Sequence, residues 1–167
     1  YGISKIERPD GHLIWIHASS IGEFKSVSTI INRLHKKFTI LVTTTTLTAS
    51  NYAIDHFGNK IIHQFAPLDI RIWVNRFLIK WKPSFVLWVE SDLWPTTLSL
   101  IKEKSIKSFL INSRISPKSF NRWKKISNDY NDMLKTFSNV FAQSKEDLNR
   151  FELELSQIDQ IKLNKTG

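Results

Sequence analysis

The chain has 167 residues, and 24 Lys and Arg against 15 Asp and Glu give it a formal net charge of +9. This length is enough to bury one hydrophobic core, and a hydrophobic content of 41% excludes a disordered polymer. The sequence contains no Cys, which excludes disulfides, thiolate zinc sites and a thiol nucleophile. No apolar stretch approaches the roughly 20 residues of a membrane-spanning helix, and no signal-peptide pattern opens the chain.

Short β-rich runs alternate with amphipathic helical runs, which predicts an α/β fold with a mainly parallel sheet and helices on both faces. The expected strands are His12–His17, Thr39–Thr44, Lys60–Ala66, Phe85–Glu90, Ser108–Asn112 and Val140–Gln143, with Gln160–Leu163 as a further candidate. The expected helices are Phe24–Leu34, Leu47–Phe57, Asp69–Lys80, Trp94–Lys104 and Lys145–Leu155. No internal repeat or linker interrupts this alternation, so we expect residues 1–167 to form a single Rossmann-like domain.

Polar side chains follow almost every expected strand. In parallel sheets, ligands bind outside the carboxyl ends of the strands, in the loops that lead to the helices. We therefore expect these loops to converge on one rim of the sheet. Their candidate site residues are Ser20, Gly22, Glu23, Thr46, Asp69, Glu90, Asp92, Arg114 and Ser116.

Glu23 has two competing interpretations. A carboxylate at the carboxyl edge of a strand is placed to take a proton from an alcohol nucleophile. However, Ser20 to Glu23 also fits the S-x-x-E capping box, in which the Glu side chain turns back to the backbone at the helix start. Spacing alone slightly favours the cap, and the two roles differ in whether the carboxylate faces the cleft.

The other loop residues also have structural alternatives. Thr46 suits a helix N-cap better than a ligand contact, and Asp92 suits the cap of the helix that contains Pro95. For Glu90, which leaves a buried strand, a functional role and a buried ion pair are equally supported. Arg114 is able to bind a phosphate or carboxylate, or to pair with Glu90 across the rim.

The segment from Lys102 to Lys125 carries eight Lys and Arg and the single acid Glu103. Such a run attracts nucleic acids or anionic membranes, although a solvated face is its more common explanation. No RNA- or DNA-recognition motif accompanies it. The five histidines have no metal-ligand spacing, and there is neither a dinucleotide fingerprint nor a P-loop, so we predict no metal and no such cofactor.

Taken together, the loop segments resemble the amino-terminal half of bacterial 3-deoxy-D-manno-octulosonic acid (Kdo) transferases. The resemblance covers nearly the whole chain in order, and the E-x-x-L-W-P and N-x-R-x-S pieces are its most specific parts. It is carried by Ile14–Glu23, Thr43–Thr48, Ala66–Asp69, Trp88–Pro95, Ile111–Ser116 and Ala142–Asp147.

The resemblance implies a B-type glycosyltransferase with two facing Rossmann-like domains, of which this chain is the acceptor-binding one. It implies transfer of Kdo from CMP-Kdo to a hydroxyl of the lipid A precursor, with inversion, at the cytoplasmic face of the bacterial inner membrane. Glu23 falls on the family's proposed general base, and the family needs no cofactor or metal. A membrane anchor and a carboxyl-terminal CMP-sugar domain are expected to lie outside the chain, which alone should be inactive.

Two alternatives remain open. Another B-type nucleotide-sugar transferase of lipid A synthesis, such as a lipid disaccharide synthase, would share the fold and the loop chemistry. A basic nucleic-acid-binding module would explain only the net charge and the run from Lys102 to Lys125, and we expect no nucleic-acid partner.

Overall fold

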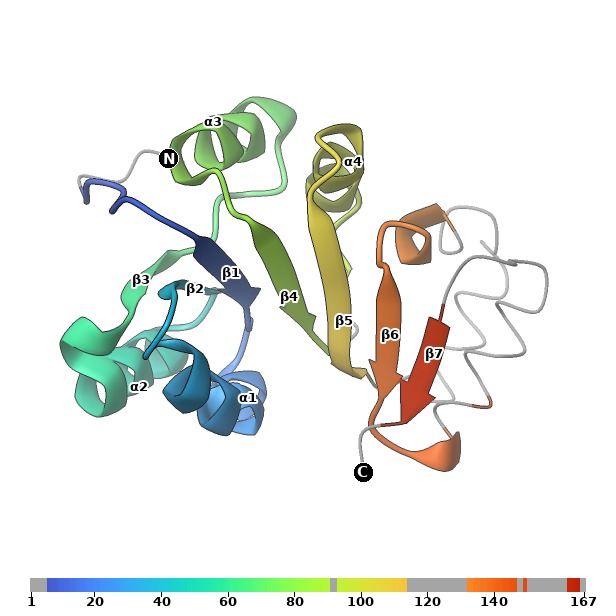
Figure 1. Cartoon of the computed structure of the whole chain (residues 1–167), viewed down its shortest axis with the longest axis horizontal. Coiled ribbons are helices and arrows are strands. Elements are labelled where there is room, and N and C mark those ends of the chain that lie inside the picture. Colours follow the sequence, from blue (N-terminus) through green and yellow to red (C-terminus); the bar gives the residue numbers. More distant parts are fainter. Residues whose placement is uncertain (1–5, 91–92, 114–131, 147–148, 150–161, 166–167) are drawn as a thin grey trace.

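The computed structural model describes residues 6–90, 93–113, 132–146, 149 and 162–165 of the chain. Seven parallel strands form one sheet in the order β3-β2-β1-β4-β5-β6-β7 (Figure 1). The strands are β1 (Leu13–His17), β2 (Thr39–Thr44), β3 (Ile62–Phe65), β4 (Phe85–Val89), β5 (Lys107–Ser113), β6 (Asn139–Ala142) and β7 (Lys162–Lys165). The predicted α/β fold with a parallel sheet is therefore confirmed.

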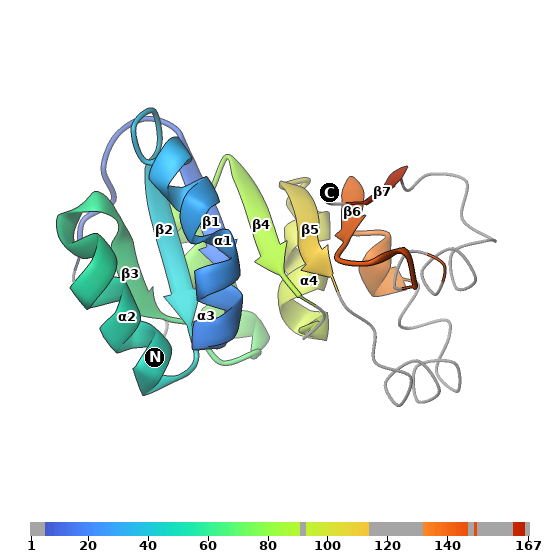
Figure 2. The ribbon, with the colours of Figure 1, turned by 90° about the horizontal axis from the view of Figure 1, so that it is seen from below.

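Helices cover both faces of this sheet (Figures 1 and 2). They are α1 (Ile21–Leu34), α2 (Leu47–Phe57) and the short 3-10 helix η1 (Gly58–Lys60), followed by α3 (Arg71–Trp81) and α4 (Pro95–Glu103). α1 and α2 pack on one face, whereas α3 and α4 pack on the other. This two-sided cover explains why the central strands are apolar on both faces.

Strand β1 is buried at every position and supplies both hydrophobic cores. Leu13 and Trp15 belong to the core under α3 and α4, whereas Ile14 and Ile16 belong to the core under α1 and α2. This division follows from the alternation of side chains along a strand. Burial of each large apolar side chain contributes roughly 1.5–3 kcal/mol, so β1 anchors the domain and the loop that follows it.

Most boundaries agree with the sequence prediction, and the exceptions have local causes. β3 begins at Ile62 instead of Lys60 because residues 58–60 form η1. α3 begins at Arg71, two residues later than expected, and ends at Trp81. Its C-cap residue, Lys82, has a left-handed backbone (φ 40°) directly before Pro83. The expected helix Lys145–Leu155 lies mostly outside the described residues.

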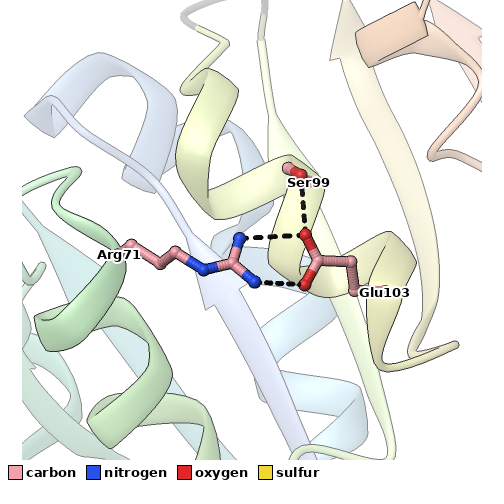
Figure 3. Close-up of polar contacts among 3 residues, drawn as sticks. All are labelled: Arg71, Ser99 and Glu103. Atoms are coloured by element: carbon pink, nitrogen blue, oxygen red, sulfur yellow. Dashed lines mark hydrogen bonds and ion pairs between the residues drawn. The ribbon is translucent and has the colours of Figure 1, made fainter.

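Helices α3 and α4 lie side by side and share a bidentate ion pair. Both Arg71 terminal nitrogens donate to the Glu103 carboxylate, at 3.0 and 2.7 Å, and Ser99 Oγ donates to the same carboxylate (Figure 3). The pair raises the pKa of Arg71 and lowers the pKa of Glu103 through these hydrogen bonds. Both side chains are largely exposed, so solvent screens the pair and it adds little to stability.

The chain reverses its direction of winding between β1 and β4. The crossover after β1 runs through α1 on one face, and the crossover after β4 runs through α4 on the opposite face. In sheets of this kind, ligands bind at the carboxyl ends of the two strands whose following loops leave to opposite faces. The fold thus indicates that a ligand site is expected at the β1–α1 and β4–α4 loops.

Candidate functional site

The β1–α1 turn holds Ser20 and Glu23 in direct contact. Ser20 is the N-cap of α1, and its Oγ accepts from the Glu23 backbone N–H at 3.3 Å. The Glu23 carboxylate accepts from the Ser19 backbone N–H at 2.6 Å and from Ser20 Oγ at 2.9 Å. Glu23 is 7% exposed. Ser20 therefore caps the helix as predicted, and the Glu23 carboxylate turns back to the N–H of Ser19, one residue before the cap residue. The first turn of a helix favours its negative charge.

A buried polar network lies beneath this turn. Trp15 Nε1 donates to Thr43 Oγ1 at 2.8 Å, and the same oxygen lies 2.9 Å from His17 Nδ1. The other ring nitrogen, Nε2, lies 3.0 Å from Ser19 Oγ. Because it is completely buried, His17 has its pKa lowered to about 3 and is neutral at physiological pH.

Donor counting identifies the tautomer of His17. Trp15 occupies one lone pair of Thr43 Oγ1, and the Thr43 hydroxyl proton, fully buried, finds an acceptor in Nδ1. Nε2 then carries the ring proton and donates it to Ser19 Oγ. The rings of Trp88 and Trp94 enclose the imidazole at centroid distances of 4.2 and 4.7 Å. The network fixes Ser19, whose N–H binds the Glu23 carboxylate.

This network was not predicted, because the sequence shows only that His17 lacks a metal-ligand spacing. His17 and Thr43 are paired in register on adjacent strands. Nothing in the local spacing of either residue predicts that pairing, which arises when β1 and β2 associate.

Thr46 and Asp69 have capping roles in the structure. Thr46 Oγ1 accepts from the Ala49 N–H at 3.3 Å, which confirms the cap interpretation for α2. Asp69 accepts from the Thr96 N–H at 3.0 Å, and from the N–H and hydroxyl of Thr97 at 2.7 Å each. It thereby caps α4, whose own N-cap residue, Trp94, makes no side-chain capping bond.

Glu90 and Asn112 both have left-handed backbones, with φ of 60° and 51°. They lie at the carboxyl ends of β4 and β5, where Glu90 N donates to Ile111 O at 3.0 Å. The β5–β6 pairing also shifts register between Leu110 and Ser113. Unusual backbone of this kind costs of order 1–3 kcal/mol and concentrates at functional sites, which favours a role for this edge.

The structure brings some of the predicted site residues close together, whereas others lie outside the described residues. The β2–α2 loop is tied to the β1–α1 turn because Thr45 donates to Ser19 O through both its N–H (3.1 Å) and its hydroxyl (2.9 Å). Thr46 therefore lies beside the turn that contains Ser20, Gly22 and Glu23. Asp92, Arg114 and Ser116 lie outside the described residues, as does the proposed pairing of Arg114 with Glu90.

The described residues contain no group of three His, Asp or Glu side chains that is able to hold a metal ion. Within the same residues, no helix is both long enough and apolar enough to cross a membrane. Of the basic run, only Lys102, Lys104 and Lys107 fall within the described part of the chain.

Residues 1–164 match the sequence model of the family described as "3-Deoxy-D-manno-octulosonic-acid transferase (kdotransferase)". The chain belongs to the Kdo transferase family. This match covers nearly the whole chain and agrees with the parallel α/β fold.

Named relatives support the assignment to Kdo transferases. The "3-deoxy-D-manno-octulosonic acid transferase" of Rickettsia felis is 37% identical over 154 residues, which cover 90% of this chain and 33% of the relative. The enzyme of the same name from Haemophilus influenzae is 30% identical, covering 86% and 34% of the two chains. The "Probable 3-deoxy-D-manno-octulosonic acid transferase, mitochondrial" of Arabidopsis thaliana is 39% identical, covering 74% and 28%. The chain thus spans about a third of the length of these relatives.

Proposed function

We propose that this chain is the acceptor-binding domain of a B-type Kdo transferase that transfers Kdo from CMP-Kdo to a hydroxyl of the lipid A precursor. Membership of the family supports the sugar that is transferred. The observation that carries the proposal is the position of the Glu23 carboxylate, on the first turn of α1 at the carboxyl edge of β1, the strand next to β4. The CMP-sugar site belongs mainly to a second domain outside these 167 residues.

In the proposed reaction Glu23 is the general base. It takes the proton from a primary hydroxyl of the glucosamine disaccharide while the oxygen attacks the anomeric carbon of Kdo. CMP leaves with its bonding electron pair, and the configuration at that carbon inverts. Positioned general bases contribute typically 10²–10⁴-fold to a rate. Positive groups and helix dipoles around the leaving phosphate supply further stabilisation.

The acceptor contacts that we propose lie along the same edge of the sheet. Ser20 and Gly22 lie in the β1–α1 turn with Thr46 beside it, and Glu90 directly follows β4, the neighbouring strand. Asp92, Arg114 and Ser116 complete the proposed set from the loops after β4 and β5, with Arg114 binding a phosphate or carboxylate. Asp69 contributes indirectly, because it fixes the start of α4.

The test is a complete enzyme in which this chain replaces the matching 154 residues of the Rickettsia felis transferase. We expect the chimera to transfer Kdo from CMP-Kdo to the lipid A precursor. Glu23→Gln should lower the single-turnover rate by about 100-fold or more, because the amide is unable to accept the proton. Ser28→Ala, which removes a hydroxyl further along the same helix, is the matched control with an unchanged rate.

Two results would contradict the proposal. Transfer by the Glu23→Gln chimera within a few-fold of the unsubstituted chimera would show that another group accepts the proton. In the full-length enzyme that contains this chain, transfer from UDP-sugars in place of CMP-Kdo would favour a lipid disaccharide synthase or another B-type enzyme of lipid A synthesis.

A further inference from the structure

The buried position of Glu23 raises a question that the proposed function leaves open. An acceptor hydroxyl must reach a carboxylate that is 7% exposed and held by Ser19 and Ser20. These two hydrogen bonds use only part of the carboxylate's acceptor capacity, but burial leaves little of its surface open to an alcohol from solvent. A group that already contacts the carboxylate and also meets solvent would give the acceptor proton a route to it.

Ser20 is such a group. Its hydroxyl donates to Glu23 Oε1 at 2.9 Å, and the residue is only half-buried. A hydroxyl has one proton to donate and two lone pairs to accept with. The proton goes to Glu23, and one lone pair accepts from the Glu23 N–H. Among the described residues nothing takes the second lone pair, so Ser20 Oγ is able to accept a hydrogen bond from an incoming alcohol.

Gly22 independently indicates an approach to the same oxygen. Its φ lies outside the left-handed region, and a Cβ built there would meet just one atom within 4 Å among the described residues, Ser20 Oγ at 3.8 Å. Neither backbone conformation nor crowding by these residues therefore requires a glycine. The missing side chain leaves open the space beside the Ser20 hydroxyl.

We propose that Ser20 is a catalytic proton relay between the acceptor hydroxyl and Glu23. The proposal rests on the proposed function, in which Glu23 is the final base. The acceptor O–H bond breaks, its proton moves to Ser20 Oγ, and the Ser20 proton moves to Glu23 Oε1. The acceptor oxygen forms its bond to the anomeric carbon of Kdo as the bond from that carbon to the CMP phosphate oxygen breaks. The bonding pair leaves on CMP, and Glu23 later releases the proton to water.

The decisive variants keep the helix cap and change only the relay. Thr and Asn both cap helices well, but only Thr retains a hydroxyl. In the chimera, Ser20→Thr should keep the single-turnover rate within about fivefold, whereas Ser20→Asn should lower it by about 100-fold. Both variants should unfold near the temperature of the parent. The parent should give a curved proton inventory in mixed H₂O and D₂O, because two protons move.

Gly22→Ala tests the approach to Ser20 separately. The Cβ fits the folded chain and alanine favours a helix more than glycine does, so stability should be kept or raised. We expect kcat/KM for the acceptor to fall by about tenfold. Such a loss without unfolding would support an alcohol that approaches beside Ser20, and an unchanged kcat/KM would contradict it.

A binding measurement on the chain itself needs no turnover. The amide NMR signals of Ser20 and Gly22 should shift on titration with the glucosamine disaccharide acceptor. They should not shift with an analogue that lacks the reacting hydroxyl. Equal shifts with both compounds would contradict the contact between Ser20 and that hydroxyl.

The outcomes separate the relay from the function on which it rests. If Glu23→Gln abolishes transfer but Ser20→Asn stays within fivefold of the parent with a linear proton inventory, Glu23 takes the proton directly and the relay is wrong. If Glu23→Gln is active, the assignment of Glu23 as the base and the proposed relay are both wrong. If Ser20→Asn and Ser20→Thr are equally impaired, Ser20 acts through the shape of the turn and not through its hydroxyl.

Discussion

At the scale of single residues, His17 is the group whose ionisation state depends most on folding. Its ring lies between Trp88 and Trp94 and has hydrogen-bond partners on both nitrogens. Protonation would place a charge in a fully buried site and would reverse the hydrogen bond from Thr43. The folded chain therefore keeps His17 neutral, with its pKa lowered from 6.5 to about 3 by burial.

This shift predicts a loss of stability in mild acid. Below pH 6.5 the unfolded chain binds a proton at His17 that the folded chain rejects until the pH approaches 3. The free energy of unfolding should therefore fall by up to about 1.4 kcal/mol per pH unit from this group alone. Chemical denaturation at pH 7 and pH 5 measures the change, together with His17→Gln, in which this contribution disappears.

Exposed His12 provides the control, because His12→Gln should retain the pH dependence of the parent. Equal pH dependence in the parent and in His17→Gln would show that His17 is not the responsible group.

At the scale of elements, two contacts that differ in burial and in strength connect the start of α3 with α4. The Asp69 carboxylate binds the first turn of α4 through three hydrogen bonds and is partly buried. The Arg71–Glu103 pair joins the same two helices in open solvent (Figure 3). Desolvated capping bonds stabilise a helix more than a solvated ion pair does.

We therefore expect Asp69→Ala to lower the free energy of unfolding by about 1–2 kcal/mol, because it leaves the N-terminal amides of α4 without their cap. Glu103→Gln should leave the denaturation midpoint nearly unchanged. Urea denaturation of both variants at pH 7 makes the comparison. A larger loss for Glu103→Gln than for Asp69→Ala would reverse this ranking.

Local sequence signals predicted the elements and two of the caps, and long-range contacts account for what they missed. Ser20 and Thr46 lie three residues before the amides that they cap, so their roles are visible in the sequence. Asp69 precedes α3 but binds the start of α4, so α3 and β4 lie between the two partners in the chain. No spacing rule indicates that contact. The left-handed backbone of Glu90 likewise arises from the meeting of β4 and β5.

At the scale of the whole molecule, the basic charge and the exposed apolar residues of α3 favour docking on an anionic membrane. Ile72 and Ile79 are each 54% exposed, and Arg76 lies between them on the same side of the helix. α3 contains no acidic residue. Cationic helices with exposed apolar side chains bind at the surface of anionic bilayers. A lipid-embedded acceptor would bring the enzyme to such a surface.

We expect the chain to co-sediment with vesicles that contain phosphatidylglycerol and not with vesicles of phosphatidylcholine alone. Ile72→Asn combined with Arg76→Glu should reduce binding about tenfold, because it removes an apolar contact and reverses a charge. Arg33→Glu, which makes the same change of two charge units at an exposed position of α1 on the other face of the sheet, is the matched charge control. Equal losses of vesicle binding for both variants would indicate that net charge alone attracts the chain to the membrane. No specific face of the chain would then be responsible for docking.

The order of the strands also determines when β1 and β4 come together during folding. Ile14 of β1 pairs with Phe85 of β4, although β2, β3 and three helical crossovers lie between them in the chain. Closing so long a loop costs entropy before any contact compensates for it, which makes parallel sheets of this kind slow to form. The carboxyl ends of β1 and β4 therefore meet only when the central sheet has assembled, and no smaller folding unit brings together the two loops that follow them.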